Sequence, residues 1–301
     1  MVFLNYQNCE ASEVNLTMKM DVSLLVQPQS AAEYLQHAYE IPQELPQLSL
    51  PDESFVTQWQ EAEGKDVLDF MAEDFSLPVA DFSWEQEDSL RISFVRTLGG
   101  RLPVIATESH EDFRGMEALL NGRAEKANLP LTVNAFTIKA KAENIFKHCV
   151  LLLNRAPYSN IPARELGLEQ EEWLERSHRL RTAHECGHYE TLRLFGGMKN
   201  NALDEILADA LGQIAAFGDF DADRQRLFFG LKKGGDTCTG RLTFYCQKVA
   251  AEERPKIYKA VNEVLDEVAA ELKELRGRQA SDWDVLAALA GKSIAGRLGR
   301  K

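Results

Sequence analysis

The chain has 301 residues, of which 45% are hydrophobic and 27% are charged, the composition of a globular protein long enough to bury its own core. Its 47 acidic residues against 34 basic ones give a net charge of −13, which argues against nucleic acid or an anionic membrane surface as a partner. The longest apolar stretch, around 150–153, is far too short to span a bilayer.

The cysteines and the first residues bear on the compartment. The five cysteines form no CxxC pair and leave one unpaired, a pattern that fits a reducing compartment better than a disulfide scaffold. The opening MVFLNYQNCEASEV lacks the basic and then apolar segments of a secretory signal. We therefore expect a cytoplasmic protein.

Residues 1–80 are expected to form an N-terminal segment with a Pro-rich linker. A helix is predicted around 31–39, and the three prolines of 41–54 indicate an extended linker. From 53 to 75 acidic and apolar residues recur at helical spacing and predict one helix. The segment is either a propeptide-like cover or an arm that binds a partner.

Residues 81–301 are expected to form the main domain, which begins with strands. Glycine and β-branched patterns predict a hairpin of 90–96 and 102–109, a helix over 111–127 with Gly122 near its end, and strands over 131–140 and 144–154. Helical periodicity then covers about 171–194, ended by Gly196-Gly197, and 202–218, ended by Gly218. Further helices are predicted at 247–276 and 281–298, so that 247–301 forms a helical tail.

The most informative motif is His184-Glu185-Cys186-Gly187-His188, an HExxH sequence inside a predicted helix. Residues four apart lie about 40° apart around a helix, so both imidazoles leave the same face one turn apart. That spacing suits two ligands of one tetrahedral Zn²⁺. Glu185 points about 100° aside, where it can accept a proton instead of binding the metal.

The next predicted helix offers a third ligand. Glu205 stands in Asp204-Glu205-Ile206-Leu207-Ala208-Asp209, and the preceding glycine pair allows this helix to fold back on the first. Asp209 lies one turn after Glu205, suited to accept the second N–H of a histidine ligand. The helix is apolar over much of its circumference, so its carboxylates require partners. We therefore expect His184, His188 and Glu205 to hold Zn²⁺, with Asp209 behind them.

Residues 131–215 resemble the gluzincin metallopeptidases, which combine an HExxH helix with a downstream glutamate followed four residues later by an aspartate. The resemblance implies an α+β, zincin-like fold, in which a small mixed or antiparallel sheet packs on the active-site helix. It also implies zinc-dependent hydrolysis of a peptide or protein substrate. Asn134 and Ala135, in LTVNAFTIKA, look like the edge strand on which many of these enzymes pair extended substrate.

In such an enzyme Glu185 would be the general base and then the acid that protonates the leaving amine. The oxyanion needs another donor, and the sequence leaves Tyr245, Arg241, Tyr258 and His178 open, with Tyr245 also a candidate for substrate binding.

Two other hypotheses compete with that of a peptidase. One is a hydrolase of the same fold that acts on a different amide or ester. The other is a non-catalytic protein in which the metal serves structure or recognition. An intact Glu185 favours an enzyme, since a purely structural site has no use for a base beside the metal. The sequence does not indicate the oligomeric state.

Overall fold

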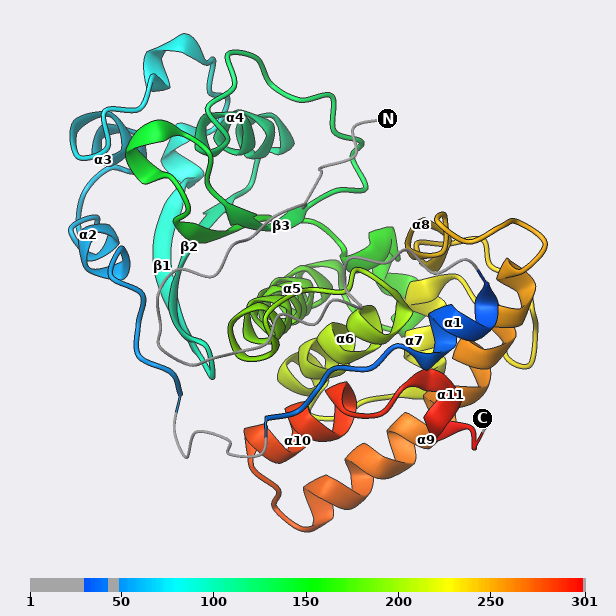
Figure 1. Ribbon diagram of the computed structural model, residues 1–301. Coiled ribbons are helices and arrows are strands. Elements are labelled where there is room, and N and C mark those ends of the chain that lie inside the picture. Colours follow the sequence, from blue (N-terminus) through cyan, green and yellow to red (C-terminus); the bar gives the residue numbers. More distant parts are fainter. Residues whose placement is uncertain (1–29, 43–48, 300–301) are drawn as a thin grey trace.

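A long helix, α5 (Gln170–Phe195), runs between a small sheet and a large group of helices in the computed structural model, which describes residues 30–42 and 49–299 (Figure 1). Its left-handed C-cap Gly196 has φ +78°, a conformation that glycine adopts without strain, so the predicted helix and its end are confirmed. We call the two groups the sheet side and the helical side of α5.

The sheet has four strands in the order β1-β2-β4-β3. The strands are β1 (Arg91–Thr97), β2 (Gly100–Thr107), β3 (Ala135–Lys139) and β4 (Cys149–Asn154). β1 with β2 and β3 with β4 pair antiparallel, whereas β2 and β4 run parallel. The predicted hairpin and both later strands are confirmed, and β3 forms one edge of the sheet.

Helices cover both faces of this sheet. All six residues of β4 are buried, as expected for a strand with packing on both faces. On one face α4 (His110–Leu120) stacks its Phe113 on Phe136 of β3. On the other face Thr137 of β3 hydrogen-bonds to α5. The predicted helix 111–127 ends early, because Gly122 turns the chain at φ +63°.

The single helix predicted over 53–75 is wrong, since the chain forms α2 (Val56–Gln60) and α3 (Val67–Glu73). Between them Gly64 has φ +79°, and the Asp66 side chain accepts the backbone N–H groups of Leu68 and Asp69 to begin α3. Of the predicted linker, residues 43–48 lie outside the described part of the chain.

The helical side contains α6 (Ala202–Phe217), α9 (Arg254–Gly277), α10 (Asp282–Ala290) and α11 (Ile294–Arg297), and α1 (Ala31–Gln36) of the N-terminal segment packs among them (Figure 1). The predicted tail is thus helical, with its elements shorter than expected. Two helices were not predicted, α7 (Ala222–Phe229) and α8 (Leu242–Tyr245). Short 3-10 helices occur at Val79–Asp81, Glu87–Ser89, Glu143–Ile145, Tyr158–Asn160 and Ala163–Leu166.

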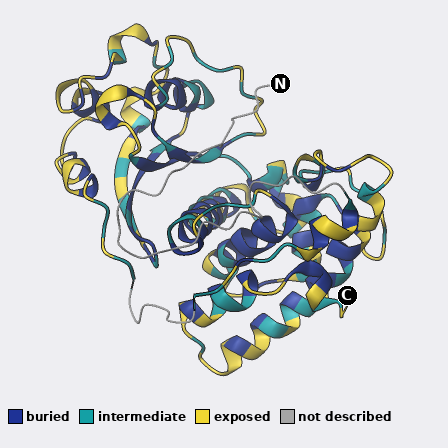
Figure 2. Cartoon of the chain, viewed as in Figure 1, coloured by how far each residue is buried: buried dark blue, intermediate teal, exposed yellow. Residues whose placement is uncertain are grey.

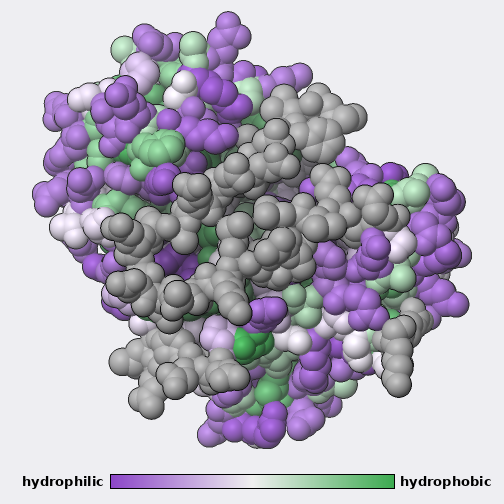
Figure 3. All heavy atoms as spheres, viewed as in Figure 1, coloured by the Kyte–Doolittle hydropathy of each residue, from purple (hydrophilic) through white to green (hydrophobic). Residues whose placement is uncertain are grey.

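The architecture is therefore α+β with a small mixed sheet and a largely helical C-terminal part, as the sequence predicted at this level. Buried residues line the surfaces where α5 and α6 meet each other and their neighbours (Figure 2). On the face drawn in Figure 3, charged and polar residues dominate outside the grey atoms, and hydrophobic residues form small separate areas. Among the described residues, no helix is both long and apolar enough to cross a membrane.

Candidate metal centre

The two histidines of the motif lie on one face of α5, one turn apart. Both are buried, and their rings stand nearly perpendicular with centroids 4.6 Å apart. The Nε2 atom of His188 lies 3.0 Å from the Nε2 atom of His184. Each ring thus directs the nitrogen that commonly binds zinc toward the same point, as the spacing predicted.

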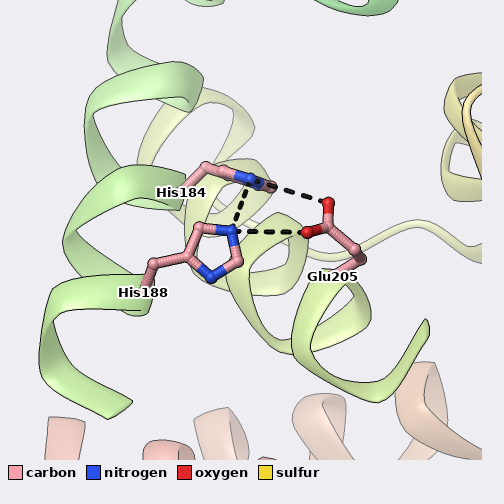
Figure 4. Close-up of side chains that lie close together, drawn as sticks. All are labelled: His184, His188 and Glu205. Atoms are coloured by element: carbon pink, nitrogen blue, oxygen red, sulfur yellow. Dashed lines mark hydrogen bonds and ion pairs between the residues drawn. The ribbon is translucent and has the colours of Figure 1, made fainter. Parts of the chain in front are cut away.

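The third group comes from α6, which the sequence positions closely against α5. Asn201 begins α6 by accepting the N–H groups of Leu203 and Asp204 with its side chain. Gly187 lies in this close contact, where an added Cβ would come within 3.1 Å of Leu211 Cδ1 and 3.3 Å of Ala208 Cα, tighter than ordinary packing. Glu205 is consequently brought to the histidines, with Oε1 3.4 Å from His188 Nε2 and Oε2 3.7 Å from His184 Nε2 (Figure 4).

These distances suit a metal ion. Two atoms that each lie about 2.1 Å from a tetrahedral zinc ion are about 3.4 Å apart, close to the 3.0, 3.4 and 3.7 Å separations found here. Within the described ranges, His184, His188 and Glu205 are the group whose ligand atoms all lie within 4.8 Å of one another. The donor set of two imidazoles and one carboxylate is also one that zinc takes.

The net charge of the buried groups also favours a bound cation. Asp204, Glu205 and Asp209 are three buried carboxylates of α6, each no more than 2% exposed, and the guanidinium of Arg241 is the cation that contacts two of them. With neutral imidazoles this group would carry an excess of two negative charges in a low-dielectric interior, which is costly. A divalent cation would remove that excess.

Asp209 lies where the sequence predicted it. Its Oδ1 is 2.8 Å from His184 Nδ1, the nitrogen that faces away from Glu205, and Oδ2 is paired with Arg241. Burial acts to raise the pKa of Asp209, but Arg241, His184 and the hydroxyl of Tyr158 hold it well below its usual range. The same balance lowers the pKa of Glu205, where His188, His184 and Arg241 outweigh burial. Both groups are therefore carboxylates at neutral pH.

Sequence reasoning missed Asp204, which is fully buried beside the second histidine. Its Oδ2 lies 3.3 Å from His188 Nδ1, a charge contact that falls short of a well-aligned hydrogen bond. Burial lowers the pKa of His188, but Asp204 and Glu205 together raise it well above the usual value. The sequence did offer one signal for Asp204, which is its position directly before Glu205 on a helix that is otherwise apolar.

Glu185 faces the sheet side. Its Oε2 accepts a hydrogen bond of 2.7 Å from Thr137 Oγ1 on the edge strand β3, and the same hydroxyl lies 3.1 Å from the Glu185 backbone carbonyl. Thr137, which sequence reasoning also missed, thereby fixes the carboxylate between α5 and β3.

The remaining candidates fall into two groups. Tyr245 lies on α8, where burial and then the charge of Glu205 raise the pKa of its phenol well above the usual value, and Arg241, just before α8, donates to Glu205 at 2.9 Å. Tyr258 lies instead in the hydrophobic core of the helical side, and His178 is half-buried near Arg181 and Arg155.

The two residues proposed for substrate lie at the start of β3. Ala135 pairs with Leu153 of β4. Asn134 is buried, and its side chain bonds to Leu131 and Asn154. Their role toward substrate stays a prediction.

Comparison with known proteins identifies a family for this chain but does not indicate an activity. A family model described as a family of unknown function (DUF7005) matches residues 132–294, more than half of the chain, which includes β3, β4, α5 and α6. No curated protein and no solved structure matches the chain. On the strength of that match, the chain belongs to the family of unknown function DUF7005.

Proposed function

We propose that this protein is a zinc-dependent hydrolase, a metallopeptidase with a gluzincin-like, zincin-type site. The observation that carries the proposal is the convergence of His184, His188 and Glu205 within 4.8 Å of one another, beside a glutamate that follows the first histidine. A structural zinc site commonly has four protein ligands, many of them cysteines, whereas a catalytic one keeps an open position. The group here offers three.

When bound, zinc would make water a nucleophile at neutral pH and polarise the substrate carbonyl. Glu185 would accept the proton of the attacking water and pass it to the leaving amine as the bond to nitrogen breaks. The hydrogen bond from Thr137 keeps this carboxylate beside the edge strand. Extended substrate pairing along β3, at Asn134 and Ala135, would bring a peptide carbonyl to the same place.

The negative charge that develops on the carbonyl oxygen needs a donor from the chain. The charge of Glu205 acts on the buried phenol of Tyr245, and Arg241 donates to the Glu205 carboxylate, whereas Tyr258 lies in the hydrophobic core. Arg241 is already paired with both Glu205 and Asp209. We therefore assign the donor role to Tyr245.

The test measures zinc content and cleavage together. The purified full chain should hold one zinc per molecule and cleave members of a mixed peptide library, and a chelator should abolish the cleavage. Glu185→Gln is the matched control, because it keeps the ligands and removes the base. It should retain zinc and lose about 100- to 10,000-fold in rate.

Each failure has its own meaning. Full activity of Glu185→Gln would show that this residue is not the base. Zinc without cleavage of any peptide would favour a different amide or ester substrate, tested with a panel of both, or a non-catalytic role. Absence of bound zinc from the wild-type protein would refute the proposal outright.

A further inference from the structure

Each of the two histidines faces a buried carboxylate that accepts the hydroxyl of a tyrosine. His184 Nδ1 contacts Asp209 Oδ1, which accepts the hydroxyl of Tyr158. His188 Nδ1 lies beside Asp204 Oδ2, and the other oxygen of Asp204 accepts the hydroxyl of Tyr39 at 2.5 Å. Both histidines thus have a carboxylate and a phenol behind them, with a hydrogen bond of 2.8 Å to the carboxylate at His184 and a charge contact of 3.3 Å at His188.

Two hydrogen bonds hold the hydroxyl of Tyr39 in place. The Tyr39 hydroxyl donates to Asp204 and accepts the backbone N–H of Lys199 at 3.1 Å, so both functions of the oxygen are used. The second carboxylate oxygen of Asp204 receives the N–H of Asn200 at 3.2 Å. Asp204 is therefore held through both of its oxygens, and loss of the Tyr39 hydroxyl would leave a buried oxygen without its donor.

Tyr39 comes from a part of the chain far from the motif. It follows α1 in the N-terminal segment, where its backbone N–H donates to the carbonyl of Ala290 at the end of α10. The residues matched by the family model begin only at 132. The contact of Tyr39 with Asp204, behind His188, thus depends on packing of residues 30–42 against the helical side.

Tyr158 comes from a strained turn. The next two residues, Ser159 and Asn160, have φ angles of 50° and 56°, which are uncommon for residues other than glycine. The Tyr158 hydroxyl also lies 3.0 Å from His184 Nδ1, and the guanidinium groups of Arg181 and Arg241 each lie over its ring. Backbone strain of this kind persists where the surroundings require one conformation, and here that conformation delivers a hydroxyl to the histidine's partner.

We propose that Tyr39 and Tyr158 are positioning residues that fix the two zinc-binding imidazoles through Asp204 and Asp209, so that the N-terminal segment contributes to metal affinity. The inference rests on the proposed zinc site. Groups behind the ligands act by holding each imidazole in the tautomer and orientation that bind metal, and their loss typically costs 10- to 100-fold in affinity.

The experiment measures the zinc dissociation constant of the full chain by competition with a chromogenic chelator. Tyr39→Phe and Tyr158→Phe should each weaken zinc binding by about 10-fold, because each removes one hydroxyl and keeps the ring. Tyr189→Phe is the matched control: this buried tyrosine follows His188 directly, but its hydroxyl donates to Glu53 on the sheet side. It should bind zinc as the wild type does.

A double-mutant cycle tests the route through the carboxylate. Asp204→Asn should weaken binding by itself, and adding Tyr39→Phe should then cost little more, since both changes break the same connection. Additive losses would overturn that route. Wild-type affinity in either folded tyrosine variant would overturn the inference and leave the proposed zinc site standing, whereas a wild-type chain without zinc would overturn both. If one variant failed to fold by circular dichroism, the other would decide, as both must show the loss.

Discussion

The two sides of α5 differ in what they bury. Toward the sheet, Cys186 and Tyr189 enter a hydrophobic core built from the strands and α2 to α4. Toward the helical side, His184 and His188 face the carboxylates of α6. One helix therefore packs like an ordinary core element on one face and lines a charged interior on the other.

This contrast suggests different roles for the two sides in the proposed site. Buried carboxylates are tolerated only with partners, so the helical side requires a cation or protons to balance its charge. On the sheet side the buried carboxylates of α4 already have partners in the chain, since Asp112 accepts two backbone N–H groups and Glu117 pairs with Arg123. The contribution of that side to the site is the hydrogen bond that holds Glu185. We expect changes on the helical side to affect metal binding, and changes on the sheet side to affect rate or stability alone.

The largest effect is expected for Glu205→Ala. Removal of one of three ligands should weaken zinc binding at least about 1,000-fold, because structural zinc sites are worth about 10–16 kcal/mol in total. A chelator should lower the melting temperature of the wild type, since bound metal stabilises the folded state by mass action. The variant's melting temperature should be the same with and without chelator, and a chelator shift of wild-type size would contradict the ligand assignment.

Gly212→Ala tests whether the contact of α5 with α6 sets the site. A Cβ at this position would lie 2.7 Å from the backbone oxygen of Leu180, so the helices must separate. We expect a loss of about 3 kcal/mol in the free energy of unfolding, together with weaker zinc binding. Gly277→Ala is the control, because nothing lies within 4 Å of its added methyl group. Equal stability of the two variants would refute the tight helix contact.

Thr137→Val removes the hydroxyl on Glu185 and keeps the shape of the side chain. The rate of hydrolysis should fall about 10-fold, the cost of one lost hydrogen bond of about 1.4 kcal/mol, while zinc affinity is unchanged. Kinetics and chelator competition on the same preparation would check this. Loss of zinc in this variant would break the proposed division between the two sides.

Cys186→Ala should have the smallest effect. The thiol is buried in the sheet-side core, so its loss should cost about 1 kcal/mol in stability, measured by urea unfolding, and leave zinc affinity unchanged. Altered zinc binding would mean that the thiol side of α5 is coupled to the metal ligands after all.

Local patterns predicted the elements that carry the site. The sequence predicted α5 and α6 from their periodicity, and their ends from the glycines at 196 and 218. These predictions succeeded because capping and helical spacing depend on near neighbours. The same reasoning failed between 53 and 75, where the turn at Gly64 outweighed a helical pattern. It also overlooked α7 and α8, which are only eight and four residues long.

By itself the sequence determined that two imidazoles share a helix face and that a following helix carries Glu205 and Asp209, since these relations need only the geometry of a single helix. The tertiary structure alone decided that Tyr39 reaches Asp204 and Thr137 reaches Glu185. These pairs are 165 and 48 residues apart, and no local pattern records which distant side chains packing will bring together. Segments far apart in the chain meet only when the cores on both sides of α5 form, so the surroundings of the proposed ligands are a product of the whole fold.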